Sequence, residues 1–121
     1  MEARNLMIGD TISVKPSGMP IKVAAVHRKK VAYHAVINKL AWVRESLLEP
    51  IPLTQEILEK NGFSNKGTLW YLEEDNFELE HNNNDSFIWI VGDVYIVASI
   101  KYVHELQQAL RLSKIRKVIE L

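Results

Sequence analysis

The stretch LLEPIPLTQEILEKNGF, residues 47–63, decides how this chain is organised, because it separates a strand-like half from a half that begins with a helix. Pro50 and Pro52 disfavour helical backbone in the residues that precede them, so we expect an extended linker or an edge strand before the helix. We therefore place the internal boundary here, between a small barrel-like β subdomain at 1–53 and a second subdomain at 54–121. We expect the two to form one compact unit.

A short helix is predicted directly after the prolines. Thr54 is a good N-cap, because its hydroxyl can accept a hydrogen bond from a free amide of the first turn. Gly62 stands where a helix often ends in the left-handed conformation, and Phe63 can then contact Leu58. The pattern predicts a capped helix over 55–61.

Before the prolines, short stretches of alternating apolar and polar residues are separated by turn residues. Such alternation is typical of half-buried strands. The predicted strands are TISVK (11–15), PIKVAAVH (20–27), VAYHAVI (31–37) and LAWVRE (40–45). Because these strands are short and closely spaced, they predict a small antiparallel β-barrel-like sheet.

After the predicted helix, four further strands suit an antiparallel β-meander. They are TLWYLE (68–73), NFELEH (76–81), FIWIV (87–91) and VYIVA (94–98). The last two are apolar on both faces, so we expect central strands that are covered on both sides. Gly92-Asp93 between them suits a tight hairpin turn. The fold class is α+β: the N-terminal sheet, a helix, the meander and a C-terminal amphipathic helix.

The C-terminal amphipathic helix is predicted over 100–112, with Ser99 as its N-cap. Steps of 100° per residue place one apolar stripe toward the core and His104 on the opposite, solvent-facing side. The apolar stripe consists of Tyr102, Val103, Leu106, Ala109 and Leu110.

The same helix contains His104-Glu105, which comes within one residue of the H-E-x-x-H motif of zinc proteases. Gln108 stands where the second His is required, and Gln is a poor zinc ligand. The residues after it contain no His to complete a metal site. We therefore expect no catalytic residue, no metal and no cofactor, and we consider a metal hydrolase improbable.

The charges are segregated along the chain, although they sum to zero. Residues 1–47 hold eight Lys or Arg against three Asp or Glu, a net charge of +5, while residues 48–98 have −8 and residues 99–121 have +3. The basic half can bind an anionic partner such as nucleic acid, or its charges can be neutralised within the fold or across a dimer.

If the basic half binds nucleic acid, cations should contact phosphates and an aromatic ring should stack on a base. Charged turns also solubilise hairpins, and Trp42 can instead fill the core, so both readings remain open. The candidate nucleic-acid-binding residues are Lys22, Arg28, Lys29, Lys30, Lys39 and Trp42.

Composition excludes several function classes. The 121 residues, of which 47% are hydrophobic and 25% charged, are typical of a globular protein. Because there is no cysteine, disulfides, thiolate nucleophiles and Cys-ligated metals are excluded. No apolar run has the length of a signal peptide or a membrane-spanning helix, so we expect a cytoplasmic protein with no membrane partner.

Three stretches resemble small uncharacterised proteins of gut Bacteroidales bacteria and of their phages or integrated elements. They are NLMIGDTISV (5–14), EPIPLTQEILEKNGF (49–63) and YVHELQQALRL (102–112). Some relatives resemble YVHELQHAL, which completes the zinc motif, whereas this chain has Gln108. The resemblance implies a phage or mobile-element setting and no catalytic activity.

We therefore expect a non-enzymatic binding or accessory protein of a phage or mobile element, which acts through its surface on a protein partner. Nucleic-acid binding through the basic N-terminal half is the alternative. A structural or assembly subunit, including a homo-oligomer, is the further alternative.

Overall fold

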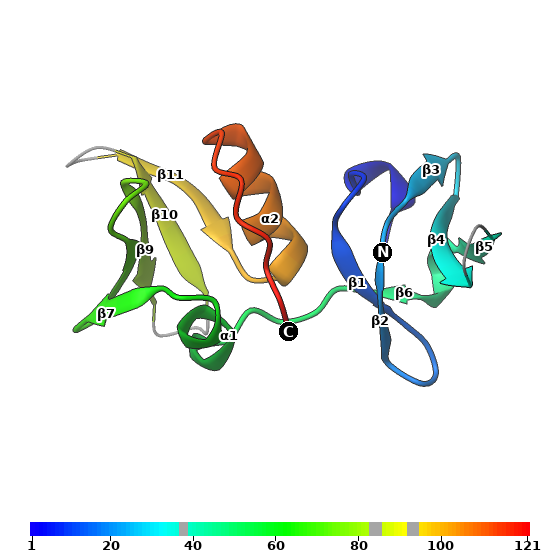
Figure 1. The fold of residues 1–121 in the computed structure, drawn as a ribbon, viewed down its shortest axis with the longest axis horizontal. Coiled ribbons are helices and arrows are strands. Elements are labelled where there is room, and N and C mark those ends of the chain that lie inside the picture. Colours follow the sequence, from blue (N-terminus) through cyan, green and yellow to red (C-terminus); the bar gives the residue numbers. More distant parts are fainter. Residues whose placement is uncertain (37–38, 83–85, 92–94) are drawn as a thin grey trace. The chain divides into compact units, whose positions relative to one another are not determined.

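The computed structural model describes residues 1–36, 39–82, 86–91 and 95–121 (Figure 1). Most of its regular structure is antiparallel strand, with two α-helices, so the fold is of the α+β kind. The chain divides into two compact units, Met1–Ile51 and Pro52–Leu121.

The first unit contains two open three-stranded sheets and two short 3-10 turns (Figure 1). One sheet, in the order β2-β1-β6, consists of β1 (Thr11–Val14), β2 (Met19–Lys22) and β6 (Leu48–Glu49). The other, in the order β3-β4-β5, consists of β3 (Ala25–His27), β4 (Lys30–Val36) and β5 (Lys39–Arg44). The 3-10 turns are η1 (Ala3–Asn5) and η2 (Glu45–Leu47).

The expected barrel-like sheet is replaced by these two sheets because the chain changes sheet between two consecutive residues. The Val23 amide donates to the Asp10 carbonyl at 2.9 Å, which extends the β1–β2 sheet. The next amide, that of Ala24, donates to Ala32 of β4 at 2.8 Å. The predicted strand at 20–27 is therefore two strands, β2 and β3, joined at a corner.

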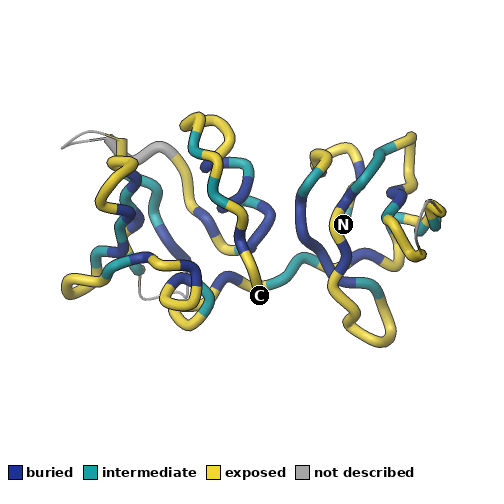
Figure 2. Tube along the Cα trace, in the orientation of Figure 1, coloured by how far each residue is buried: buried dark blue, intermediate teal, exposed yellow. Residues whose placement is uncertain are grey.

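Both sheets contribute to one hydrophobic core. Its buried members come from both sheets and from the segment after η1, and the strand β1 is buried along most of its length (Figure 2). They are Leu6, Ile12, Ile21, Val23, Val31 and Leu48. Because the inner residues of both sheets meet in this core, the other face of the β3-β4-β5 sheet is left outside it.

The second unit begins with α1 (Gln55–Lys60), and the capped helix predicted from the sequence is confirmed. The Ile57 amide donates to the Thr54 hydroxyl at 3.2 Å. Gly62 has a positive φ of 82°, and the Phe63 amide donates to the Leu58 carbonyl at 3.0 Å. This is the hydrogen-bond pattern of a Schellman C-cap.

A five-stranded antiparallel sheet follows, in the order β11-β10-β9-β8-β7 (Figure 1). Its strands are β7 (Ser64–Lys66), β8 (Leu69–Leu72), β9 (Phe77–His81), β10 (Phe87–Val91) and β11 (Tyr95–Ile100). The predicted meander is confirmed, and β7 is an additional strand. The Gly92-Asp93 turn lies outside the described residues.

The prediction that the last meander strand is central was wrong. In the described sheet, β11 is an edge strand that pairs only with β10, because it is the last strand of the meander and the chain then forms α2 from Val103. One sheet face carries the buried aromatic and aliphatic side chains, as strand alternation requires. These are Trp70, Leu72, Phe77, Leu79 and Phe87.

The last helix, α2 (Val103–Leu112), begins later than predicted. Ser99 belongs to β11, and the helix start is capped by the Glu105 carboxylate, which accepts from the Lys101 and Tyr102 amides at 2.9 and 3.0 Å. The predicted core stripe is confirmed for Val103, Leu106, Ala109 and Leu110, which are buried. None of the helices in the described part of the chain is long and apolar enough to cross a membrane.

His104 was expected to face solvent, and this expectation was wrong. Its side chain is buried, and its ring stacks on that of Tyr102 with centroids 5.9 Å apart. The covered part of α2 is wider than an apolar stripe, since Gln107 is buried as well. The apolar residues of a helix therefore locate the centre of its buried face and not its limits.

The segment after α2 is held against α1 by Asn61. Its side-chain amide donates to the Glu120 carbonyl and accepts from the Glu120 amide, both at 2.7 Å, and it also donates to Ile57. Lys60 adds a hydrogen bond from Nζ to the Leu121 carbonyl, and Ile119 is buried. Because Asn61 is itself buried, its hydrogen bonds between α1 and the segment after α2 are shielded from solvent.

We predict that Asn61→Ala lowers the free energy of unfolding by about 1–3 kcal/mol, because it removes the buried side chain whose amide pairs with both backbone groups of Glu120. Asn65→Ala is the matched control. The Asn65 amide also donates to two carbonyls, those of Gly67 and Leu69, but the residue is exposed. The control should cost about 0.5 kcal/mol. Urea unfolding of both variants measures the difference, and equal losses would contradict the buried joint.

We predict that Leu106→Ala costs about 2–5 kcal/mol, because a fully buried side chain is truncated. Leu112→Ala makes the same change in the same helix at a side chain that is 71% exposed, so it should stay within about 0.5 kcal/mol. Thermal or urea unfolding separates the two. A reversed ranking would mean that α2 is turned about its axis relative to this structure.

Candidate functional site

The candidate site lies on the outer face of the β3-β4-β5 sheet. Residues directly opposite one another on antiparallel strands, and residues two apart along a strand, share a face. The register pairs His27 with Lys30 and Lys30 with Arg44, then Ala25 with Ala32 and Ala32 with Trp42, then His34 with Leu40. We call this set of residues the Trp42 face: Ala25, His27, Lys30, Ala32, His34, Leu40, Trp42 and Arg44.

Trp42 is the main apolar group of this face, and its side chain is 49% exposed. Its ring meets that of His27 edge-on, with centroids 6.4 Å apart and an interplanar angle of 77°. A hollow of about 620 Å³ beside the indole is lined by Val26, His27, Lys30 and Trp42. Trp42 therefore does not fill the core, and its ring is accessible from a hollow with basic side chains.

The residues that share the row of Trp42 are small. Ala32 lies directly opposite Trp42, and Ala25 lies opposite Ala32 on the next strand. Both side chains are single methyl groups, so a large indole stands beside two small neighbours. Ala32 is fully buried, and the open space beside the ring is lined by Val26, His27 and Lys30.

Lys30 and Arg44 place two positive charges directly opposite each other across β4 and β5. Like charges in such positions destabilise a strand pair. Arg4 pairs with Glu2 and Lys15 with Glu49, whereas neither Lys30 nor Arg44 has a carboxylate partner among the residues that the structure describes.

The neighbouring carboxylate, Glu45, is used elsewhere. Its Oε2 accepts a hydrogen bond from the Ala3 amide at 2.9 Å, which ties η2 to η1. A second hollow of about 340 Å³ is lined by Lys29, Lys30, Arg44, Glu45 and Ser46. Lys30 lines both this hollow and the one beside Trp42, so the two adjoin through one cation.

The six residues predicted from the sequence are not all brought together. Lys30 and Trp42 share the face, and Arg28 and Lys29 form the β3–β4 turn beside it, where Arg28 has a positive φ of 55°. Lys22 lies on β2 and lines a separate hollow of about 430 Å³. Lys39 is exposed at the first residue of β5.

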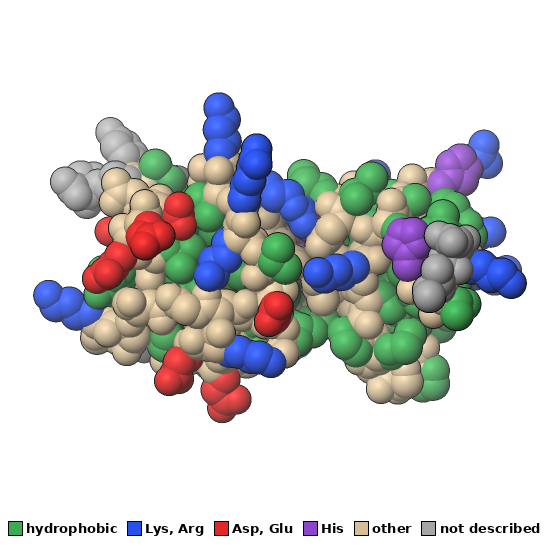
Figure 3. Space-filling model, viewed as in Figure 1, with side chains coloured by type: hydrophobic (Ala, Val, Ile, Leu, Met, Phe, Trp, Pro, Cys, Tyr) green, Lys and Arg blue, Asp and Glu red, His purple; other side chains and the backbone are tan. Residues whose placement is uncertain are grey.

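Two members of the face, His27 and Arg44, were missing from the predicted set. The sequence contains a signal for both. Arg44 is two residues from Trp42, so the two share a face of a strand, and His27 is the last residue of the predicted strand 20–27, next to the basic turn. The register is needed to place them beside Lys30. His34 joins the face to the Lys22 hollow, which it lines with Tyr33. Figure 3 shows Lys, Arg and His side chains gathered around this sheet.

The charge of the first unit agrees with a surface for anions. Residues 1–51 hold eight Lys or Arg and four Asp or Glu, which gives a net charge of +4. Residues 52–121 hold seven Lys or Arg and eleven Asp or Glu, which gives a net charge of −4. A field of this sign attracts phosphates toward the first unit.

The zinc-like motif in α2 has a structural explanation. The Glu105 carboxylate caps the helix by accepting two backbone amides, and His104 stacks on Tyr102. Within the residues that the structure describes, no three His, Asp or Glu side chains gather as a metal site requires.

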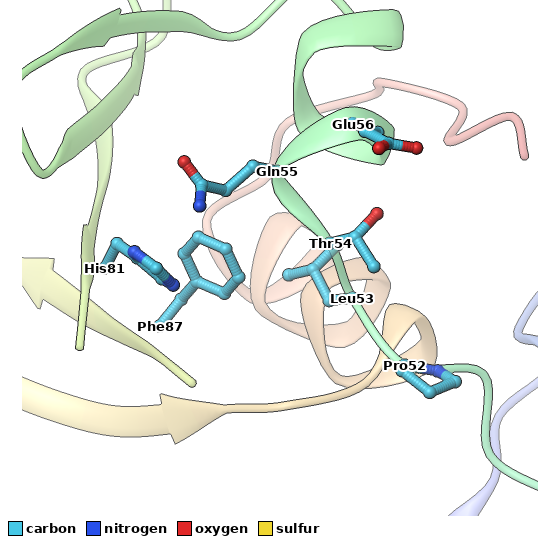
Figure 4. Close-up of a pocket in the computed structure, with 7 residues that line it drawn as sticks. All are labelled: Pro52, Leu53, Thr54, Gln55, Glu56, His81 and Phe87. Atoms are coloured by element: carbon cyan, nitrogen blue, oxygen red, sulfur yellow. The ribbon is translucent and has the colours of Figure 1, made fainter. Parts of the chain in front are cut away.

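The second unit has a hollow of its own, of about 390 Å³, between the segment before α1 and the β9–β10 hairpin (Figure 4). Leu53 and Phe87 are buried, and the His81 ring lies 5.0 Å from that of Phe87. The Gln55 amide and the His81 ring lie beside the Phe87 ring, and Glu56 points away from them. These groups select no single ligand class, so we assign this hollow no function.

Comparisons with known proteins add no assignment: no protein family model matches the chain, and neither a curated protein nor a solved structure matches it.

We predict that Trp42→Ala costs about 1–2 kcal/mol of unfolding free energy, because only half of the side chain is buried. Trp70→Ala removes the same side chain at a site that is 6% exposed, and it should cost about 3–5 kcal/mol. Thermal unfolding of the two variants checks the orientation of β5. A larger loss for Trp42→Ala would place that indole in the core.

Proposed function

We propose that this protein is a non-enzymatic nucleic-acid-binding protein that uses the Trp42 face. The observation that carries the proposal is a half-exposed tryptophan next to two like-charged residues on one open sheet face. Aromatic stacking on bases and cation contacts to phosphates are the two terms that hold a nucleic acid on such a surface.

Folding alone does not account for this arrangement. A Lys–Arg pair in directly opposite positions costs stability, and an exposed indole gives up burial that a core position would provide. A phosphate bound between Lys30 and Arg44 removes the repulsion between them, and a base against Trp42 buries the exposed ring. Both costs are therefore offset in one complex with one class of ligand.

The sequence favoured a protein partner over nucleic acid, and the position of Trp42 reverses this preference. Trp and Arg are common at protein–protein interfaces as well, but Lys is depleted there, and here Lys30 shares the face with Trp42. The mobile-element setting implied by the resemblance to Bacteroidales and phage proteins is kept as part of the proposal. An accessory protein of such an element is compatible with nucleic acid as the partner.

We predict that the parent protein binds labelled DNA with an affinity that falls steeply as salt rises. Each phosphate neutralised contributes a slope of about −0.9 for duplex or about −0.7 for single strands in a plot of log K against log salt. Lys30→Ala/Arg44→Ala should flatten the slope by roughly 0.7 to 0.9, because the two cations contact one phosphate between them. Fluorescence anisotropy at several salt concentrations measures this slope.

The matched control is Arg4→Ala/Lys15→Ala, which removes two cations from the same unit but outside the β3-β4-β5 sheet. Both form exposed ion pairs, so their loss should cost about 1 kcal/mol or less. Its salt slope should change less than that of the Lys30 and Arg44 variant. Equal changes of the salt slope in the two double variants would show that net charge alone attracts the DNA. A parent protein that binds no DNA at low salt would rule out the proposal.

A further inference from the structure

The shape of the Trp42 face selects among nucleic acids, and this inference rests on the proposed function. Inside a duplex, both faces of every base are covered by the neighbouring base pairs, so a protein ring can stack only on an unpaired or displaced base. The half-exposed indole of Trp42 borders a hollow of about 620 Å³, which is open space beside an aromatic ring. A duplex therefore cannot place the flat face of a base in the hollow beside Trp42.

The position of Trp42 supports the same conclusion. It lies within β5, at the fourth residue of six, on the face of a three-stranded sheet and not in a turn. A flexible single strand can lie across such a face and turn one base toward the ring. The cations for the adjacent phosphates, Lys30 and Arg44, occupy the next row of the same face, roughly 7 Å along the strands.

We propose that the Trp42 face binds single-stranded nucleic acid, with one base stacked on Trp42 in the hollow bounded by His27 and Lys30. The phosphate next to that base contacts Lys30 and Arg44. The ligand chemistry is an unpaired base with its attached phosphate, which single-stranded DNA and RNA share. The strand continues toward His34, on the same face, and the adjoining Lys22 hollow.

The test compares the full chain with two variants at the same position. Trp42→Leu keeps an apolar side chain for the half that is buried but removes the aromatic face, and Trp42→Phe keeps a smaller aromatic face. The probes are labelled oligothymidine, labelled oligouridine and a blunt-ended DNA duplex of equal length. Titrations are made at one low salt concentration, and the melting temperature of each variant is recorded.

We expect the parent to bind the single strands more tightly than the duplex. Trp42→Leu should weaken single-strand binding by roughly 5- to 150-fold, the affinity equivalent of one lost base stack, and should leave duplex binding nearly unchanged. Trp42→Phe should retain most of the affinity. Tighter binding of either oligothymidine or oligouridine than of the duplex supports the inference, and their ratio identifies the preferred sugar.

The failure of this inference is distinguishable from the failure of the proposed function. Equal binding of duplex and single strands, unchanged in Trp42→Leu but weakened in Lys30→Ala/Arg44→Ala, overturns the stacking site and leaves nucleic-acid binding in place. Absence of binding to all three probes overturns both. Equal losses in Trp42→Leu and Trp42→Phe, at unchanged melting temperatures, also overturn the inference, because an aromatic ring would then have no special role.

Discussion

The pairing of Val31 with Val43 in the core determines which residues of β4 and β5 lie on the outer face of the β3-β4-β5 sheet. Because side chains alternate along each strand, this inward pair places Ala32 and Trp42, one residue further along β4 and one residue back along β5, on the opposite face of the sheet. A register slip of one residue would turn Lys30 and Arg44 toward the core, where unpaired charges are costly. The hydrophobic core therefore determines both the fold of the first unit and the composition of the surface that we assign to a ligand.

Local features of this fold could be predicted from the sequence, and long-range pairings could not. The helix α1 and its Gly62 cap follow from residues next to one another, as does the alternation of β8 and β9. The change of sheet at Val23 and Ala24 depends on which distant strands accept their amides, and no local pattern contains that information. For the same reason the sequence predicted one barrel-like sheet where the structure has two open ones.

The candidate site shows the same division. Lys30 and Trp42 were identified from residue type alone, but both faces of LAWVR carry apolar residues, so alternation left open which side was inward. The register resolved this ambiguity and added His27 and Arg44. The burial of His104 was likewise outside the reach of a helical wheel, since polar residues can lie at the margin of a buried face.

The opposed cations Lys30 and Arg44 have a consequence for how solvent conditions act on the molecule. Dissolved ions screen the repulsion between exposed charges, so added salt should strengthen the β4–β5 hairpin. The same ions compete with phosphates for these two side chains and weaken complex formation. Ionic strength thus moves conformational stability and ligand affinity in opposite directions through one pair of residues. At low ionic strength the β4–β5 hairpin is least stable and the affinity for phosphate is highest. An anionic ligand that binds between Lys30 and Arg44 therefore also stabilises this strand pair.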